Sequence, residues 1–353
     1  MKDLGVINDP VFEQKPSYNA LDRFFLKLIR DERDLPFTHL TLRITLFMIP
    51  LAFLLYMPFI TGLVWWGIAA MYFFLNNLYF KGPFGLMLHC TSHRPFFKEK
   101  YGWMNHYLPW FMAPFFGNTP ETYFIHHIAM HHVENNLEED ISSTMHYQRD
   151  NFTDFLKYLG NFLFLVIFQL YDYHKAKKRY QFLPRLIIGE LSFYLMCALL
   201  FIVNPAATIV VFILPYLIFR IITMVGNWTQ HTFVDPEDPE NLYKSSINCI
   251  NVHYNHKCWN DGYHISHHIR PNMHWTQHPL EFQKNKAKYA ANQAIVFDGL
   301  DFLQVFYYVM RKRYDVLAAH FVNIDGMFDS EEEIIQMLKR RTQKIPKPSP
   351  SVA

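Results

Sequence analysis

Histidines gather in three short segments of this chain, and histidine is the side chain that most often binds metals or moves protons near neutral pH. Of the 19 histidines, His89 and His93 form a first pair in the segment HCTSH. Residues four apart on an α-helix project from one face, about 40° from each other, so both imidazoles can reach one metal ion. The pair alone is weak evidence, and it gains weight from two further clusters.

The second cluster is the segment HHIAMHH, which contains His126, His127, His131 and His132. Thr119–Pro120 precedes it and is a helix-start signal, with threonine as N-cap and proline in the first turn. On an α-helix from that point, His127 and His131 are about 40° apart and His132 lies about 100° further round, whereas His126 points away. The pattern therefore predicts three ligands, with His126 beside a ligand or packed against protein.

The third cluster is the segment GYHISHH, with His264, His267 and His268. If these residues are helical, the three imidazoles lie within an arc of about 100°, which suits convergence on one site. A buried imidazole needs a hydrogen-bond partner and gains little as packing, so a purely structural role explains these dense clusters poorly. A solvated histidine-rich loop is the alternative, and we favour a metal centre.

Long apolar runs must position these clusters. The chain has 353 residues, of which 51% are hydrophobic, and four runs approach the ~20 residues that a helix needs to cross a bilayer. They cover residues 42–60, 62–80, 186–203 and 206–225. The links around Thr61–Gly62 and Asn204–Pro205 are short, so the runs pair as two antiparallel hairpins. We expect an all-α integral membrane protein with four spans and a single domain over residues 1–353.

A fifth apolar segment, residues 155–173, makes the topology ambiguous. If it crossed the membrane, the basic stretch 175–179 would lie on the far side, against the tendency of Lys and Arg to stay cytoplasmic. We therefore interpret it as an interfacial helix, with a fifth span as the alternative. The histidines then share the cytoplasmic side, in a cap made of residues 81–154 and 226–344, and residues 345–353 form a disordered tail.

Two charges fall inside the apolar runs, Glu190 and Arg220. They are almost equally far from the turn at Asn204–Pro205, so an antiparallel hairpin brings them to a similar depth. Lone charges in hydrocarbon are costly, so the sequence predicts a salt bridge between them.

The chain resembles the membrane fatty acid desaturase superfamily. The resemblance rests on HxxxH, a box ending in HH, and HxxHH, with pairs of spans between them, and it covers about Thr41 to Gln277. In that family three histidine boxes and one histidine after the last span hold two irons. The extra histidine is matched by His231 in NWTQH, and Asn227 matches an asparagine that reaches an iron through water. The resemblance thus implies nine ligands: His89, His93, His127, His131, His132, His231, His264, His267 and His268.

One departure from the family pattern concerns the second box. The commonest form in the family is HxxHH, whereas this chain has HxxxHH from His127. The departure puts the ligand register in question and leaves the product open between an alkene and an alcohol. Carboxylates can orient metal ligands, and the candidates for that role are Glu138, Glu139, Asp140 and Asp261.

The leading functional hypothesis is an oxygen-dependent fatty-acyl desaturase that uses two irons. Breaking an unactivated C–H bond needs an oxidant made from dioxygen, and zinc, which also accepts imidazole, has no redox chemistry. Electrons would come from a separate ferredoxin-, rubredoxin- or cytochrome b5-like carrier, which could dock on basic residues between Lys284 and Arg313.

Three alternatives remain. The same irons could hydroxylate a fatty acid or lipid, or could decarboxylate a fatty acid to a terminal alkene. A metal transporter is a distant alternative, because the four predicted spans contain no histidine. The net charge of +2 and the absence of a basic stripe give no indication of nucleic-acid binding.

Overall fold

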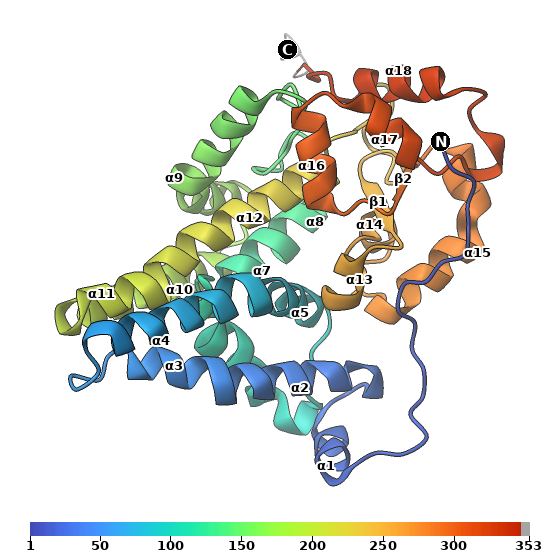
Figure 1. The fold of residues 1–353 in the computed structure, drawn as a ribbon. Helices are drawn as coiled ribbons and strands as arrows, with labels where there is room; N and C mark the ends of the chain where they lie inside the picture. The colour runs from blue at the N-terminus through green and yellow to red at the C-terminus, as the bar shows by residue number, and fades with distance from the viewer. Residues whose placement is uncertain (347–353) are drawn as a thin grey trace. The chain divides into compact units, whose positions relative to one another are not determined.

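The computed structural model describes residues 1–346, and within them helices predominate. The α-helices are α1 Ala20–Leu28, α2 Leu35–Arg43, α3 Ile49–Leu54, α4 Gly62–Phe74, α5 Lys81–His93, α6 Ala113–Phe116, α7 Thr122–His126, α8 His132–Glu134, α9 Phe152–Ala176, α10 Phe182–Val203, α11 Pro205–Thr208, α12 Leu214–Gln230, α13 His253–Lys257, α14 His264–Ile269, α15 His278–Ala291, α16 Phe302–Met310, α17 Tyr314–His320 and α18 Glu331–Arg341 (Figure 1). Two strands, β1 Ile247–Ile250 and β2 Ile295–Asp298, form a small parallel sheet.

The chain packs as two compact units, each assembled from separate stretches. Unit 1 contains Met1–Val11, Ala129–Leu170 and the chain from Thr223 onward, and unit 2 contains Phe12–Ile128 and Tyr171–Ile222. Helices α9 and α12 each run from one unit into the other. The sequence-based description of one membrane domain with a cap stays a prediction.

Five helical rods in the described part of the chain are long and apolar enough to cross a membrane: Glu32–Leu54, Gly62–His93, Phe152–Ala176, Phe182–Val203 and Pro205–Gln230. The fifth apolar segment of the sequence is thus a full-length helix, α9. Length and composition alone do not distinguish a span from an interfacial helix, so its predicted interfacial position stays a prediction.

The helical rods of the first predicted hairpin differ in extent from the apolar runs of the sequence at two places. The first rod ends at Leu54 and the link runs to Thr61, because Pro58 disfavours helical backbone in the residue before it. The second rod continues past the predicted end at Phe80 to His93, so α4 leads into α5 as one rod (Figure 1). Lys81 does not end the helix because its Nζ donates to the Phe116 carbonyl at 2.8 Å.

Among the described residues, five stretches are π-helical, and three of them lie within the apolar rods. The five stretches cover Ile44–Met48, Leu75–Phe80, Tyr107–Met112, His127–His131 and Ile209–Ile213. Four of them are followed by a proline two or three residues later: Pro50, Pro83, Pro114 and Pro215. A helical proline clashes with the carbonyl four residues back, and in each case that carbonyl belongs to the π-helical stretch, where the wider turn relieves the clash. The stretch at His127–His131 has no such proline.

Unit 1 has its core around the small sheet. Ile247 pairs with Ile295 in parallel register. Both are buried in a cluster that includes Phe297 of β2, Val305 of α16 and Leu317 of α17. The sheet adjoins α14, which carries the third histidine cluster. A rigid core thus lies directly beneath those histidines.

The predicted ion pair between Glu190 and Arg220 is confirmed within unit 2. The Arg220 guanidinium lies 3.7 Å from the Glu190 carboxylate, and both side chains are buried. At Gly117, with φ at 91°, a Cβ would lie 2.3 Å from the Pro215 carbonyl oxygen, so only glycine fits there.

The predicted disordered tail falls mostly on residues 347–353, which lie outside the described residues. At its predicted start, the backbone N–H of Ile345 donates to the Met145 carbonyl at 2.8 Å.

Candidate metal centre

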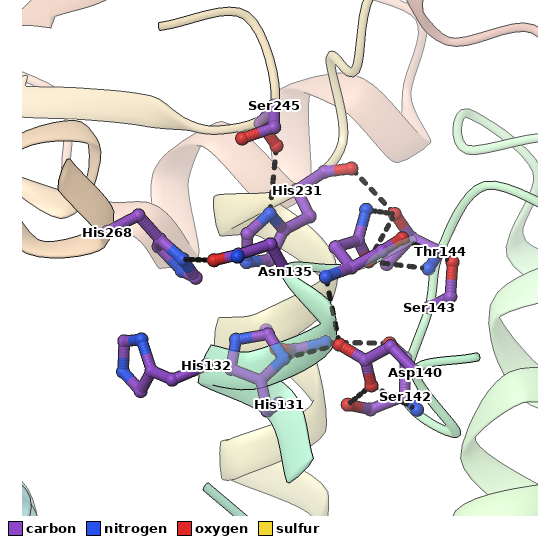
Figure 2. Close-up of polar contacts among 12 residues, drawn as sticks. His131, His132, Asn135, Asp140, Ser142, Ser143, Thr144, His231, Ser245 and His268 are labelled. Atoms are coloured by element: carbon purple, nitrogen blue, oxygen red, sulfur yellow. Dashed lines mark hydrogen bonds and ion pairs between the residues drawn. The ribbon is translucent and has the colours of Figure 1, made fainter. Parts of the chain in front are cut away.

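Four histidines converge inside unit 1, and all four are buried. They are His131 at the end of the second cluster, His231 just after α12, and His264 and His268 on α14. A ligand nitrogen from each lies within 4.8 Å of the others. Figure 2 shows His131, His231 and His268 surrounded by polar side chains of the loop that follows the second cluster.

Hydrogen bonds fix which nitrogen of these rings can bind a metal. Nδ1 of His131 donates to the Asp140 carboxylate at 2.6 Å, and Nδ1 of His231 donates to the Ser245 carbonyl at 2.8 Å. Nδ1 of His268 lies 3.1 Å from the amide oxygen of Asn135 (Figure 2). Because each acceptor receives a hydrogen bond from Nδ1–H, the hydrogen of the neutral ring stays on Nδ1 and Nε2 keeps its lone pair, as in metal-bound histidines.

His231 is the clearest ligand candidate by burial. Its side chain is 0% exposed, and its Nε2 has no hydrogen-bond partner. Burial, with a smaller contribution from His131, lowers the pKa of His231 to about 3. A buried polar nitrogen without a partner is costly, and a neutral imidazole is the form that binds metal, so a bound cation would resolve the cost.

The spacing of the nitrogens also fits a shared ion. Two nitrogens bound to one metal at ~2.1 Å and at angles of about 90–110° lie ~3.0–3.4 Å apart. Nε2 of His268 lies 3.0 Å from Nε2 of His264. The residues present therefore fit a histidine-bound metal.

The loop after the second cluster makes a rigid frame for this group. Asp140 accepts three further bonds, from the backbone N–H of Asn136 and from the N–H and hydroxyl of Ser142. Thr144 donates its hydroxyl to the His231 carbonyl at 2.7 Å, and its own N–H donates to Asn136 (Figure 2). The frame ties the second cluster to the residue that follows α12.

Unit 2 brings together three histidines of its own. Nitrogens of His89, His93 and His127 lie within 4.8 Å of one another, and Nε2 of His93 is 3.4 Å from Nε2 of His127. His89 is buried, whereas His93 and His127 are half-buried. The ring of Tyr123 stacks on His127 at 5.4 Å. This spacing also fits nitrogens that share one ion.

The last two predicted ligands, His132 and His267, face each other within unit 1. Their Nε2 atoms are 2.9 Å apart. All nine predicted ligands thus lie in local groups of two, three or four, and their role as metal ligands stays a prediction. His126 belongs to none of these groups of described residues.

The local backbone of the second cluster differs from the sequence-based expectation. Thr119 is not an N-cap: α7 begins at Thr122, with Glu121 in the cap position at a φ of 67°. The α-helical wheel was also wrong, because His127–His131 is π-helical. A π-turn holds one residue more than an α-turn and is frequent at functional sites, so it absorbs the extra residue of HxxxHH.

Other predicted residues take varied positions. Asn227 lies on α12 one turn before His231, and its Nδ2 donates to the Tyr158 hydroxyl at 2.7 Å and the Ser142 carbonyl at 3.0 Å. Asp261 accepts from the Tyr254 hydroxyl at 2.7 Å. Glu138 and Glu139 are exposed. Among the four candidate acids, Asp140 accepts a hydrogen bond from a predicted ligand, His131.

Sequence reasoning missed several residues of the site. Asp9, far away in sequence, is buried and accepts from the Tyr263 hydroxyl at 2.6 Å, directly before His264. Asn135 ends α8 in left-handed conformation, and its side chain then reaches His268. Two asparagines after a helix are a C-cap signal that would have predicted this bend.

A comparison with protein families matches residues 78–299, more than half of the chain, to the fatty acid desaturase family. The match includes all nine predicted ligands. Comparisons with curated proteins and with solved structures give no match. With five apolar rods and histidine groups that fit a metal, the chain belongs to the fatty acid desaturase family and is a multi-pass membrane oxidoreductase that modifies fatty acids.

Proposed function

We propose that the protein is a dioxygen-dependent fatty-acyl desaturase with two histidine-bound irons. The observation that carries the proposal is the four-histidine group of unit 1, whose ligand nitrogens converge within 4.8 Å. Three of these rings have Nδ1 held by a partner, which leaves Nε2 for a metal. Family membership supplies the class of substrate.

The two irons divide the predicted ligands. One iron is bound by the unit 1 group of His131, His231, His264 and His268, and the other by the unit 2 group of His89, His93 and His127. The two further predicted ligands are His132 and His267. Asn227 acts on an iron through water. Its amide nitrogen already donates to Tyr158 and Ser142, which leaves the amide oxygen for that role.

Iron is the metal whose chemistry matches the reaction. Imidazole binds both zinc and iron, but only iron can take part in electron transfer. When bound, the irons supply the oxidising chemistry with dioxygen that removes hydrogen from two adjacent carbons. The chain's own residues hold the ligands: Asp140 and the Ser245 carbonyl orient their imidazoles, and the burial of His231 excludes water.

The substrate chain enters from the membrane. In this arrangement four of the apolar rods span the bilayer, α9 lies in the interface, and the histidines lie on the cytoplasmic side. Lys175 in the last turn of α9 and Lys178 just beyond it are exposed, which suits a position at the headgroups. Phe164 and Phe168 are also exposed and suit contact with lipid.

The electrons come from a separate small carrier, of the ferredoxin, rubredoxin or cytochrome b5 type. The exposed lysines of α15, Lys284, Lys286 and Lys288, support docking of an acidic partner.

A second candidate reaction rests on the widened second box. A changed position of the substrate relative to the oxidant would give hydroxylation, or oxidative decarboxylation to a terminal alkene. Metal transport is not proposed, because the family is one of oxidoreductases.

Product profiling distinguishes these reactions. The chain would be expressed in a host of known lipids, and fatty acids of several lengths would be followed by mass spectrometry. Desaturation predicts products two mass units lighter at unchanged chain length, and His267→Ala should abolish them. Products with one added oxygen, or one carbon fewer and a terminal alkene, would replace the proposal with the second candidate.

A further inference from the structure

Glu190 is a buried carboxylate in the middle of an apolar helix. It is the ninth residue of α10, and the residue as a whole is 4% exposed. Ionisable groups in such helices are costly and usually functional. The pairing with Arg220 offsets part of this cost, but that distance of 3.7 Å is longer than a hydrogen bond.

The shorter contacts of Glu190 go to the segment before the second histidine cluster. Its Oε1 accepts from the Thr119 hydroxyl at 2.5 Å and from the Thr122 hydroxyl at 2.6 Å. Both threonines are buried. Thr122 is the first residue of α7, and His127 follows directly after that helix. One carboxylate oxygen therefore holds the start of the helix that leads to a predicted ligand.

The backbone around these threonines is packed directly on α10. A Cβ at Gly189 would lie 1.9 Å from the Pro120 carbonyl oxygen, so the two backbones touch. Glu121 adopts a φ of 67°, an uncommon conformation for a residue other than glycine. Its carboxylate is held by Arg185 Nε at 2.9 Å and by Trp110 Nε1 at 2.9 Å. The segment 119–122 thus has a seat made by residues 185–190.

We propose that Glu190 is a positioning residue for the second histidine cluster, which acts by fixing the start of α7 and hence the direction of His127. The inference rests on the proposed iron chemistry for its functional consequence, although the seat itself does not depend on metal. A buried acid in this helix would then be retained for its bonds to two hydroxyls, with Arg220 neutralising its charge.

The experiment compares three changes at the seat with one matched control. Glu190→Gln keeps an oxygen that accepts both hydroxyls, whereas Glu190→Leu removes it. Thr119→Val combined with Thr122→Val removes the donors at nearly unchanged volume and leaves Glu190 paired with Arg220. Tyr194→Phe is the control. Tyr194 lies on the same helix as Glu190, and the change removes its 2.8 Å hydroxyl bond to Tyr216 of α12 while the bonds of Glu190 to Thr119 and Thr122 stay in place.

Two readouts are measured on the full-length purified protein. Hydrogen exchange of peptides covering residues 119–128, without metal, reports the seat itself. Titration with ferrous iron reports the consequence for metal binding. We expect Glu190→Leu and the double valine variant to exchange faster and to bind iron about 10-fold more weakly at one site, as is typical for groups that orient a ligand. Glu190→Gln and Tyr194→Phe should stay near wild type.

The other outcomes contradict either the positioning role of Glu190 or the proposed function. If the double valine variant exchanges and binds iron like wild type, the positioning role is wrong. If Glu190→Gln is as impaired as Glu190→Leu, the charge pair with Arg220 is what matters, and the inference is also overturned. If Glu190→Leu does not fold, the double valine variant still decides. Wild-type protein that binds no iron would refute the proposed function, while the exchange data would still test the seat.

Discussion

The histidine groups of the two units differ in how their surroundings hold them. In unit 1, His231 is 0% and His131 is 2% exposed, and both donate Nδ1 to fixed acceptors. In unit 2, His93 and His127 are half-buried, and the tyrosine ring beside His127 offers stacking. The same residue type is thus placed in a buried polar frame in one unit and in a more open aromatic setting in the other.

If both groups hold an iron, as proposed, this difference in burial should make them bind it with different strength. A buried frame fixes tautomers and ring directions, which favours tight and slow-exchanging metal binding. A half-buried group admits water more easily, and a water molecule can take the place of a lost imidazole ligand. We therefore expect the loss of a ligand, or exposure to a chelator, to affect iron binding differently in the two units.

The largest expected effect is the loss of a ligand from the buried group. His231→Ala should lower product formation by at least about 100-fold, more than the loss of an orienting residue costs, and should release iron. His93→Ala should also impair product formation but retain more iron, because water can replace its imidazole. Metal analysis and product quantification would be run together. His126→Ala, from the same cluster as the ligands, is the matched control and should keep both iron and activity.

Removal of iron by a chelator compares the two histidine groups without any mutation. Iron should leave the wild-type protein in two phases, the faster one from the more open group. The time course of iron loss to an excess of chelator is the measurement, and His93→Ala should increase the rate or remove the fast phase. A single phase that His93→Ala leaves unaltered would mean that the two groups are equally accessible.

A change in the loop that follows the second cluster, which orients His131, should lower iron binding least. Asp140→Asn keeps the shape of the side chain but removes the charge that accepts from His131, so iron affinity should fall by roughly 10–100-fold. The fall should be confined to the slowly exchanging iron. Glu240→Gln, at an exposed acid in the same unit, is the control. An affinity equal to wild type would show that the frame does not orient the ligand.

The sequence predicted the residue types of the site better than their surroundings. Histidine clusters and apolar runs are local patterns, and so is the spacing of Glu190 and Arg220 about a turn, which led to the confirmed ion pair. The second predicted span ends at Phe80, where the apolar run ends, whereas the helical rod continues past Lys81 to His93. The charge of Lys81 is satisfied by the carbonyl of Phe116, a contact between distant residues that no local pattern contains.

At the candidate metal centre, too, the features that local sequence patterns do not encode were the ones that could not be predicted. The π-helical backbone at His127–His131 has no signature in a 3.6-residue period, so the wheel at that point was wrong. Asp9 and the Ser245 carbonyl reach the third cluster and His231 only through tertiary packing. Asn135 alone carried a local signal, as a left-handed residue at a helix end.

Mössbauer spectroscopy of the purified protein, loaded with isotopically enriched iron, shows whether these histidines hold two irons. We expect two irons per chain, in two distinguishable environments whose signals both disappear on full chelation. One iron per chain, or full catalytic activity with zinc in place of iron, would refute the di-iron proposal.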